Sequence, residues 1–219
     1  GIPDAPVTDI ARMAGANWIS TDGGGVARQD AEGLWRIFNV ANAGQNFLSD
    51  DCRALAEDGD ILWIATNLGL SLYSRESNAF LPPITTAGGR LPNPQVQDVA
   101  VGGGYVIAAT AQGVAERLPD NTWVPHRRST FSWDNSTGTD FARAVGFDGT
   151  WWWVMLAVSG EQPYGSLVRR RAGGDREDPA TVDIFTAGNA GLPASTGAGG
   201  VSIRVEGREM FLSYCGDEQ

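Results

Sequence analysis

The hydrophobic positions of this chain fall into short runs that Gly and Asp-Gly turns separate. The most regular unit spans residues 52–73. It holds an apolar run, a turn at Asp58-Gly59, a Trp-centred run that ends at Thr66, and a Gly that opens a third run. Runs of about 4 to 8 apolar residues between such turns are typical of antiparallel hairpins. We find no convincing helical period, so the pattern predicts an all-β fold.

The same pattern recurs along the chain at a nearly constant interval. The central position of each unit is Trp18, Trp63, Ile107, Trp153 and Phe211 in turn. These residues are 45, 44, 46 and 58 positions apart. A fourth run follows in the first four units, at residues 34–40, 79–84, 122–125 and 182–185. Four strands in a repeat of about 45 residues predict the antiparallel blades of a β-propeller.

We therefore expect four complete blades and the first two strands of a fifth. The units span roughly residues 7–50, 51–95, 96–140, 141–199 and 200–219. Large side chains at a repeated place in a blade pack between neighbouring blades. We therefore expect four side chains to be buried at equivalent positions: Trp18, Trp63, Ile107 and Trp153.

Residues 57–73 combine an Asp-Gly turn, the run Leu-Trp-Ile-Ala-Thr and a Gly-Leu strand that ends at a Tyr. Residues 18–28 repeat this motif fairly well, and residues 96–116 repeat it with Ile in the Trp place. The motif resembles the two-component regulator propeller repeat, and Gly191-Leu192-Pro193 resembles its connecting loop. The fourth unit departs from the repeat, because Leu156 stands where Thr is expected.

The resemblance implies a bacterial protein outside the cytoplasm. Similar propellers commonly form the periplasmic sensing part of hybrid histidine kinases or parts of secreted surface proteins, so we expect a periplasmic or extracellular chain. Such propellers usually have about seven blades. This chain would then be an arc that further chain or another subunit completes. The alternative is a five-bladed ring in which residues 1–9 supply a strand to the last blade.

Charge and composition narrow the kinds of partner. The 219 residues include 16 basic residues, all of them Arg, and 26 acidic ones, for a net charge of −10. Because this sign repels nucleic-acid phosphates and anionic membranes, no nucleic-acid partner is expected. No run approaches the roughly 18 apolar residues that a membrane span needs, so we expect no direct membrane insertion.

Binding residues are expected on one rim of the blades. In an up-and-down blade, the turn between strands two and three and the connection to the next blade emerge on the same side. Long loops on a rigid scaffold are the usual place for binding residues. The first hypothesis is therefore a non-enzymatic module that binds a protein or a glycan through Asn46, Asn67, Arg90, Trp133, Asp134 and Tyr164.

Two other functions stay open. A secreted carbohydrate-active enzyme would use rim carboxylates such as Asp50, Asp134 and Asp140, held about 5 to 10 Å apart. A structural subunit would dock the open edge of the arc onto another chain. His126, the single histidine, follows Pro125 on an outer strand and is expected at the surface, which disfavours a Ser-His-Asp triad.

Metal, cofactor and disulfide chemistry are not expected. Asp58-Gly59 and Asp148-Gly149 have the sequence of a type I′ hairpin turn and lack the ligand spacing of a calcium loop. No cofactor is therefore predicted. Cys52 and Cys215 fall in the second and fifth units, which are not neighbours, so we predict that they are not joined.

Overall fold

Antiparallel sheets form this chain in a computed structural model, which describes residues 1–127, 140–156, 166–174, 182–185, 201–206 and 209–214. Each of the first four sheets has four strands and the fifth has two, as predicted. We call these sheets blades 1 to 5. Within the described residues the one helical element is the 3₁₀ turn η1 (Ala87–Gly89), and no helix there has the length and apolar character to cross a membrane.

The strands of each blade pair in chain order, from the first strand at one edge to the last at the other. Their bounds, blade by blade, are β1 (Val7–Met13), β2 (Ala16–Thr21), β3 (Gly25–Gln29) and β4 (Trp35–Phe38); β5 (Cys52–Asp58), β6 (Ile61–Thr66), β7 (Gly69–Ser74) and β8 (Ala79–Ile84); β9 (Val96–Gly102), β10 (Tyr105–Thr110), β11 (Gly113–Arg117) and β12 (Trp123–His126); β13 (Ala142–Phe147), β14 (Trp151–Leu156), β15 (Ser166–Arg171) and β16 (Val182–Phe185); β17 (Val201–Glu206) and β18 (Glu209–Tyr214).

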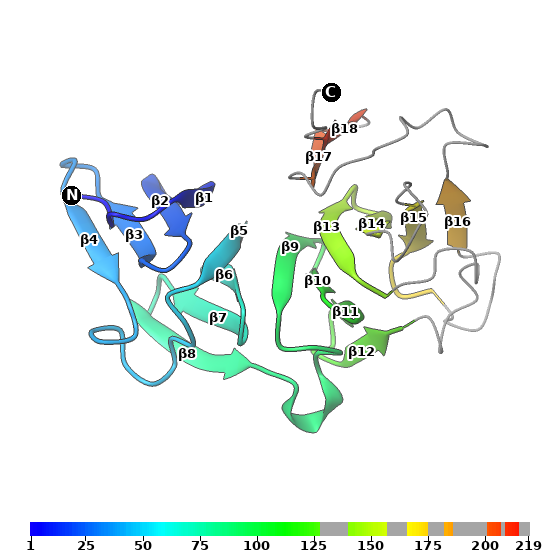
Figure 1. Ribbon diagram of the computed structural model, residues 1–219, viewed down its shortest axis with the longest axis horizontal. Coiled ribbons are helices and arrows are strands. Elements are labelled where there is room, and N and C mark those ends of the chain that lie inside the picture. Colours follow the sequence, from blue (N-terminus) through cyan, green and yellow to red (C-terminus); the bar gives the residue numbers. More distant parts are fainter. Residues whose placement is uncertain (128–139, 157–165, 175–181, 186–200, 207–208, 215–219) are drawn as a thin grey trace, which may run out of the picture.

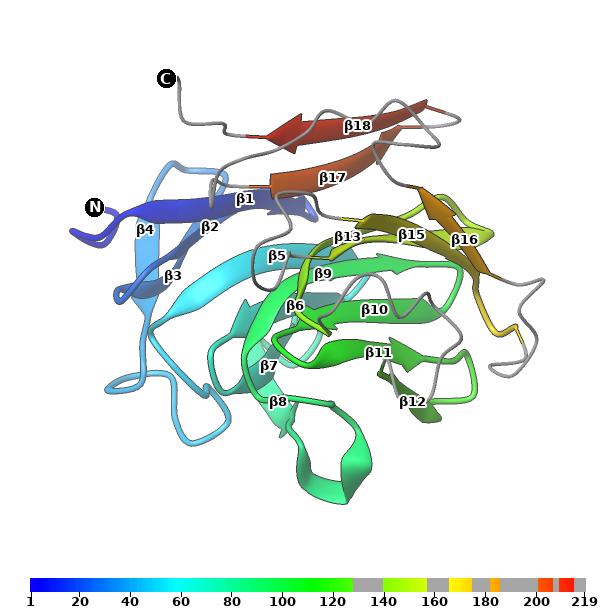
Figure 2. The same ribbon diagram turned by 45° about the vertical axis from the view of Figure 1, so that its right-hand side comes forward.

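The blades stand side by side with their first strands innermost. Contacts join β1 to β5, β5 to β9, β9 to β13 and β13 to β17. Figures 1 and 2 show this row as an open arc, with blade 1 at one end and blade 5 at the other. Val7 and Asp9 pair with β2 inside blade 1, so they do not extend the last sheet as the five-bladed alternative required. The fold is an arc of a β-propeller.

The Thr and Gly of the repeat close the turn between the second and third strands. The Thr hydroxyl donates to the Gly carbonyl oxygen at 2.7 to 2.8 Å in three pairs: Thr21 with Gly25, Thr66 with Gly69, and Thr110 with Gly113. Gly113 has a φ of +115°, and a Cβ there would lie 2.1 Å from the carbonyl oxygen of His126. Glycine is required because the fourth strand passes this close.

Large side chains at one place in the second strands pack each blade on the next. Trp18 is fully buried, and its ring centroid lies 4.7 Å from that of Tyr73 in blade 2. Trp63 is 4% exposed and lies against Trp123 of blade 3, with 6.3 Å between the ring centroids. Ile107 is fully buried in the cluster between blades 3 and 4. These three side chains are buried as predicted.

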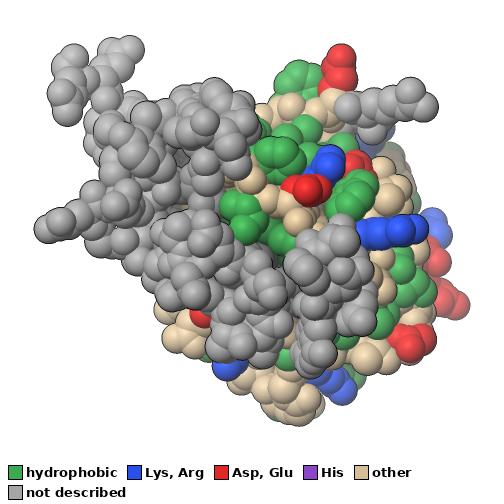
Figure 3. All heavy atoms as spheres, turned by 90° about the vertical axis from the view of Figure 1, so that its right-hand side faces the viewer, with side chains coloured by type: hydrophobic (Ala, Val, Ile, Leu, Met, Phe, Trp, Pro, Cys, Tyr) green, Lys and Arg blue, Asp and Glu red, His purple; other side chains and the backbone are tan. Residues whose placement is uncertain are grey.

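Trp153 occupies the same place in blade 4 but is only partly buried, which corrects the prediction for this residue. Among the described residues the blade that follows has only two strands, and Phe211 at the same place in β18 is itself 50% exposed. The guanidinium of Arg169 lies over the Trp153 ring, 5.3 Å from its centroid, and pairs with Asp183. On the side of the molecule that carries β16, hydrophobic side chains gather around a few charged ones (Figure 3).

Replacing Gly113 by Ala should destabilise the fold, because the new Cβ would collide with the His126 carbonyl oxygen at a positive φ. We expect the free energy of unfolding, measured by urea denaturation, to fall by about 2 to 4 kcal/mol. Gly59→Ala is the matched control, since Gly59 also has a positive φ but nothing lies within 4 Å of its Cβ position. That change should cost about 1 kcal/mol. Equal losses in the two variants would contradict the close approach.

Candidate functional site

Turns and blade connections share one rim of the arc, as the strand order requires. In blade 2 the backbone N–H of Asn67 donates to the carbonyl oxygen of Asp51 at 3.3 Å. In blade 3 the N–H of Ala111 donates to the carbonyl oxygen of Gln95 at 3.0 Å. The turn between the second and third strands is thus bonded to the segment that enters the same blade.

The six residues predicted for the rim do not form one described site. Asn46 lies between β4 and β5, where its Nδ2 donates to the carbonyl oxygen of Phe80 at 2.9 Å. Asn67 lies in the turn between β6 and β7, and Arg90 is exposed directly after η1. Asn46 lines a hollow of about 350 Å³ that neither Asn67 nor Arg90 lines. The other three fall outside the described residues: Trp133, Asp134 and Tyr164.

The carboxylates of the enzyme hypothesis do not form a described pair. Asp50 Oδ1 accepts the backbone N–H of Val40 at 2.8 Å, and its carbonyl oxygen accepts the N–H of Gly25 at 2.9 Å. Asp50 therefore holds the rim connections in place. Asp140 lies partly buried just before β13, and Asp134 is outside the described residues. In the part of the chain that the structure describes, no group of three or more His, Cys, Asp or Glu side chains is placed to hold a metal ion.

His126 is buried, which overturns the expectation of a surface histidine. It is 1% exposed on β12, and its Nε2 lies 2.9 Å from Oε2 of Glu116 on β11. Glu116 Oε1 accepts the backbone N–H of Gly173 in blade 4 at 2.8 Å. The corresponding position in blade 1 holds Phe38, and the ring of Trp152 in blade 4 lies 5.6 Å from the imidazole. This pair belongs to the packing between blades 3 and 4, out of reach of a substrate.

A groove along the inner side of the arc was not predicted from the sequence. It has a volume of about 700 Å³, and the first strands of all five blades line it. Each first strand pairs with only one strand of its sheet, so its other edge carries backbone N–H and C=O groups that no neighbouring strand pairs. The lining includes seven charged or amide side chains: Asp9, Arg53, Glu57, Gln97, Asp98, Arg143 and Arg204.

A β-bulge recurs near the start of the first strand in blades 1 to 4. In each blade the last residue of the second strand pairs with a residue at the start of the first strand. The first strand then has one extra residue before the next pair. A bulge leaves one residue without a partner on the next strand and redirects its side chain. The bulged residues are Thr8, Arg53, Gln97 and Arg143, and all four line the inner groove.

Two carboxylates connect the first strands of neighbouring blades. Oδ2 of Asp9 in blade 1 accepts the backbone N–H of Leu55 in blade 2 at 2.8 Å. Oδ2 of Asp98 in blade 3 accepts the backbone N–H of Val145 in blade 4 at 2.8 Å. Burial raises the pKa of Asp98 to about 7, although its backbone hydrogen bonds lower it, and the charge of Asp9 adds to the increase. Burial also raises the pKa of Asp9.

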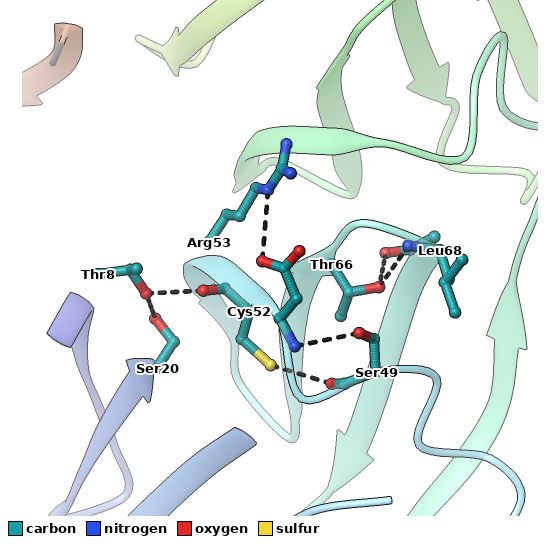
Figure 4. Close-up of polar contacts among 9 residues, drawn as sticks. Thr8, Ser20, Ser49, Cys52, Arg53, Thr66 and Leu68 are labelled. Carbon is teal, nitrogen blue, oxygen red and sulfur yellow. Dashed lines mark hydrogen bonds and ion pairs between the residues drawn. The ribbon is translucent and has the colours of Figure 1, made fainter. Parts of the chain in front are cut away.

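Blades 1 and 2 also meet through Thr8 (Figure 4). Its hydroxyl donates to the carbonyl oxygen of Cys52 at 2.8 Å and lies 2.8 Å from the Ser20 hydroxyl. Arg53 follows Cys52 in β5, and its Nε lies 3.8 Å from Oδ1 of Asp51, at the limit of an ion pair. The bulged Arg53 therefore lies next to Cys52, which contacts blade 1, and close to Asp51 at the rim.

Cys52 is a buried free thiol whose Sγ donates to the carbonyl oxygen of Ser49 at 3.3 Å. Burial raises its pKa, and the negative charges of Asp50 and Asp51 add to the increase. A thiol of this kind stays protonated and unreactive. Cys215 falls outside the described residues.

Comparison with known proteins supports the fold. No protein-family model and no curated protein matches this sequence. Among solved structures, the extracellular domain of the hybrid two-component system BT4673 from B. thetaiotaomicron is 17% identical, with a TM-score of 0.60 over 83% of this chain and 22% of that chain. The corresponding domain of BT3049 from the same organism is 16% identical, with a TM-score of 0.61 over 83% of this chain and 24% of that chain.

Streptogramin B lyase is 13% identical, with a TM-score of 0.61 over 93% of this chain and 61% of that chain. The present chain thus spans under a quarter of the length of the two extracellular domains, at 22% and 24%. At these identities the likeness shows a β-propeller fold and nothing finer, since the similar structures include both extracellular domains of two-component systems and a lyase.

The titration of Asp98 should make stability depend on pH. Its pKa of about 7 in the folded chain exceeds the unfolded value of about 3.9. The stabilising contribution is therefore complete below about pH 4 and is lost as the pH rises through about 7. One proton contributes at most about 1.4 kcal/mol per pH unit. In urea denaturation, the wild type should lose stability with rising pH more steeply than Asp98→Asn.

Asp4→Asn, which removes an exposed carboxylate, is the control and should keep the wild-type slope. Asp98→Asn also loses some stability at every pH, because its amide nitrogen cannot accept the N–H of Val145. Only the slope therefore tests the titration. Parallel pH profiles for the wild type and Asp98→Asn would contradict the raised pKa.

Proposed function

We propose that this chain is a non-enzymatic binding module of an extracytoplasmic bacterial sensor or surface protein. Its rim loops would contact a protein or a glycan. The observation that carries this proposal is the common rim, where the turn of each of blades 2 and 3 is bonded to the segment entering that blade. A rigid sheet scaffold with its connections gathered on one side is a typical base for a recognition surface.

Two further observations support binding rather than turnover. His126 is 1% exposed between blades 3 and 4, so it is not available as a general base at the surface. The Asp50 carboxylate is engaged by the backbone N–H of Val40 at 2.8 Å, which favours a structural role. The likeness in fold to extracellular domains of two-component systems supports the extracytoplasmic location.

Replacing Trp133 or Arg90 by Ala should weaken binding on an array of immobilised glycans or to a purified surface-protein partner. A flat aromatic and an exposed guanidinium are frequent anchors at interfaces, so a loss of at least about tenfold in Kd is expected for the residue in contact. The melting temperature should change little. Trp35→Ala is the matched control. Trp35 is the first residue of the outer strand β4, and this end of the strand lies far from the rim.

Two results would contradict this assignment. One is a partner whose footprint covers the opposite turns, at Asp58 and Asp148, and leaves the rim unprotected. The other is glycan hydrolysis that is lost when Asp134 or Asp140 is replaced by Asn, which would support the enzyme instead.

A further inference from the structure

We propose that the bulged residues of blades 2, 3 and 4 form a binding site for a small carboxylate-bearing ligand in the inner groove. Arg53, Gln97 and Arg143 make up this site, which we call the bulge row. It is separate from the rim residues of the proposed function, and the sequence repeat gave no sign of it.

Equivalent register places the three residues of the bulge row next to one another. The bulge follows the pairs Cys52–Thr66, Val96–Thr110 and Ala142–Leu156, which close the same end of each blade. The strands that carry them, β5, β9 and β13, are consecutive neighbours around the arc. Three consecutive blades therefore present Arg, Gln and Arg at one level of the groove. That level is the end of the first strands that meets the rim.

The charge of the bulge row contrasts with that of the whole chain, which carries a net charge of −10. Among the described residues no carboxylate lies within ion-pair distance of Arg143, whose guanidinium lies 5.4 Å from the ring centroid of Phe141. Arg53 has only the long contact of 3.8 Å with Asp51. These two guanidinium groups are therefore available to an anion.

The acidic side chains that line the groove do not neutralise this row. Asp9 and Asp98 each accept two backbone N–H groups, one from the next residue and one from the neighbouring blade. Their oxygens are thus directed at the strand edges, where N–H dipoles offset their charge. Glu57 lies near the other end of β5, away from the bulge.

The chemistry of the bulge row selects a carboxylate. A guanidinium group presents N–H donors in a planar fork that matches the two oxygens of a carboxylate, and a Gln amide adds further donors. Two cations around one amide favour a ligand with two carboxylates over a neutral one. The groove volume of about 700 Å³ falls within the usual range of small-molecule sites, about 300 to 1,000 Å³.

The test measures succinate binding to the whole chain by titration calorimetry and by ¹⁵N NMR of the Arg Nε and Gln side-chain groups. Succinamide serves as the neutral isostere, and sulfate as a non-planar anion. Wild-type protein should bind succinate more tightly than either. Arg143→Gln should weaken succinate binding by at least about tenfold, and Arg143→Lys by less, since it keeps the charge and loses the fork.

Arg36→Gln is the control, because it removes the same charge from the outer strand β4 and should bind succinate like the wild type. Circular dichroism checks that each variant keeps its sheets. The proposal is overturned if wild-type protein does not respond to millimolar succinate, if succinamide or sulfate binds as well as succinate, or if Arg143→Gln binds unchanged. Rim binding is measured separately with Trp133→Ala, so failure at the groove is distinguishable from failure of the proposed function.

Discussion

The unpaired inner edge of each first strand is the constraint on which this structure depends. A four-stranded blade pairs its first strand on one side only, so a row of backbone N–H and C=O groups faces the inside of the arc. Such groups need partners or water. Asp9 and Asp98 supply part of that need, since each bonds its own blade to the next through a backbone N–H.

The blade faces and the inner edge have different roles in the fold. Apolar contacts such as that of Trp18 with Tyr73 hold neighbouring sheets together, and the Thr and Gly of blades 1 to 3 let the fourth strand pass close to the third. The inner edge stays polar as a result, and the bulges turn Arg53 and Arg143 toward it. A groove with positive side chains thus arises in an acidic protein.

Much of the fold could be predicted because its signals are local. The Trp, Thr and Gly positions set the strands and turns of blades 1 to 3, and the hairpin spacing set the number of strands. The bulge at Arg53 could not be predicted, because a shift of one residue in pairing leaves no mark in a run of apolar residues. The surface position expected for His126 after Pro125 is wrong, because this outer strand packs one face against the next blade, at a position that holds Phe38 in blade 1. The rim residues Asn46, Asn67 and Arg90 stay predictions.

Hydrogen exchange at the inner edge tests the central claim most directly. The backbone N–H groups of Leu55 and Val145 lie on strand edges without a neighbouring strand, and this account bonds them to Asp9 and Asp98. NMR-detected exchange of both amides should be slow in the wild type. The Leu55 amide should become fast in Asp9→Ala, while the Val145 amide stays slow. Fast exchange of both amides in the wild type, at the rate of open backbone, would contradict the account.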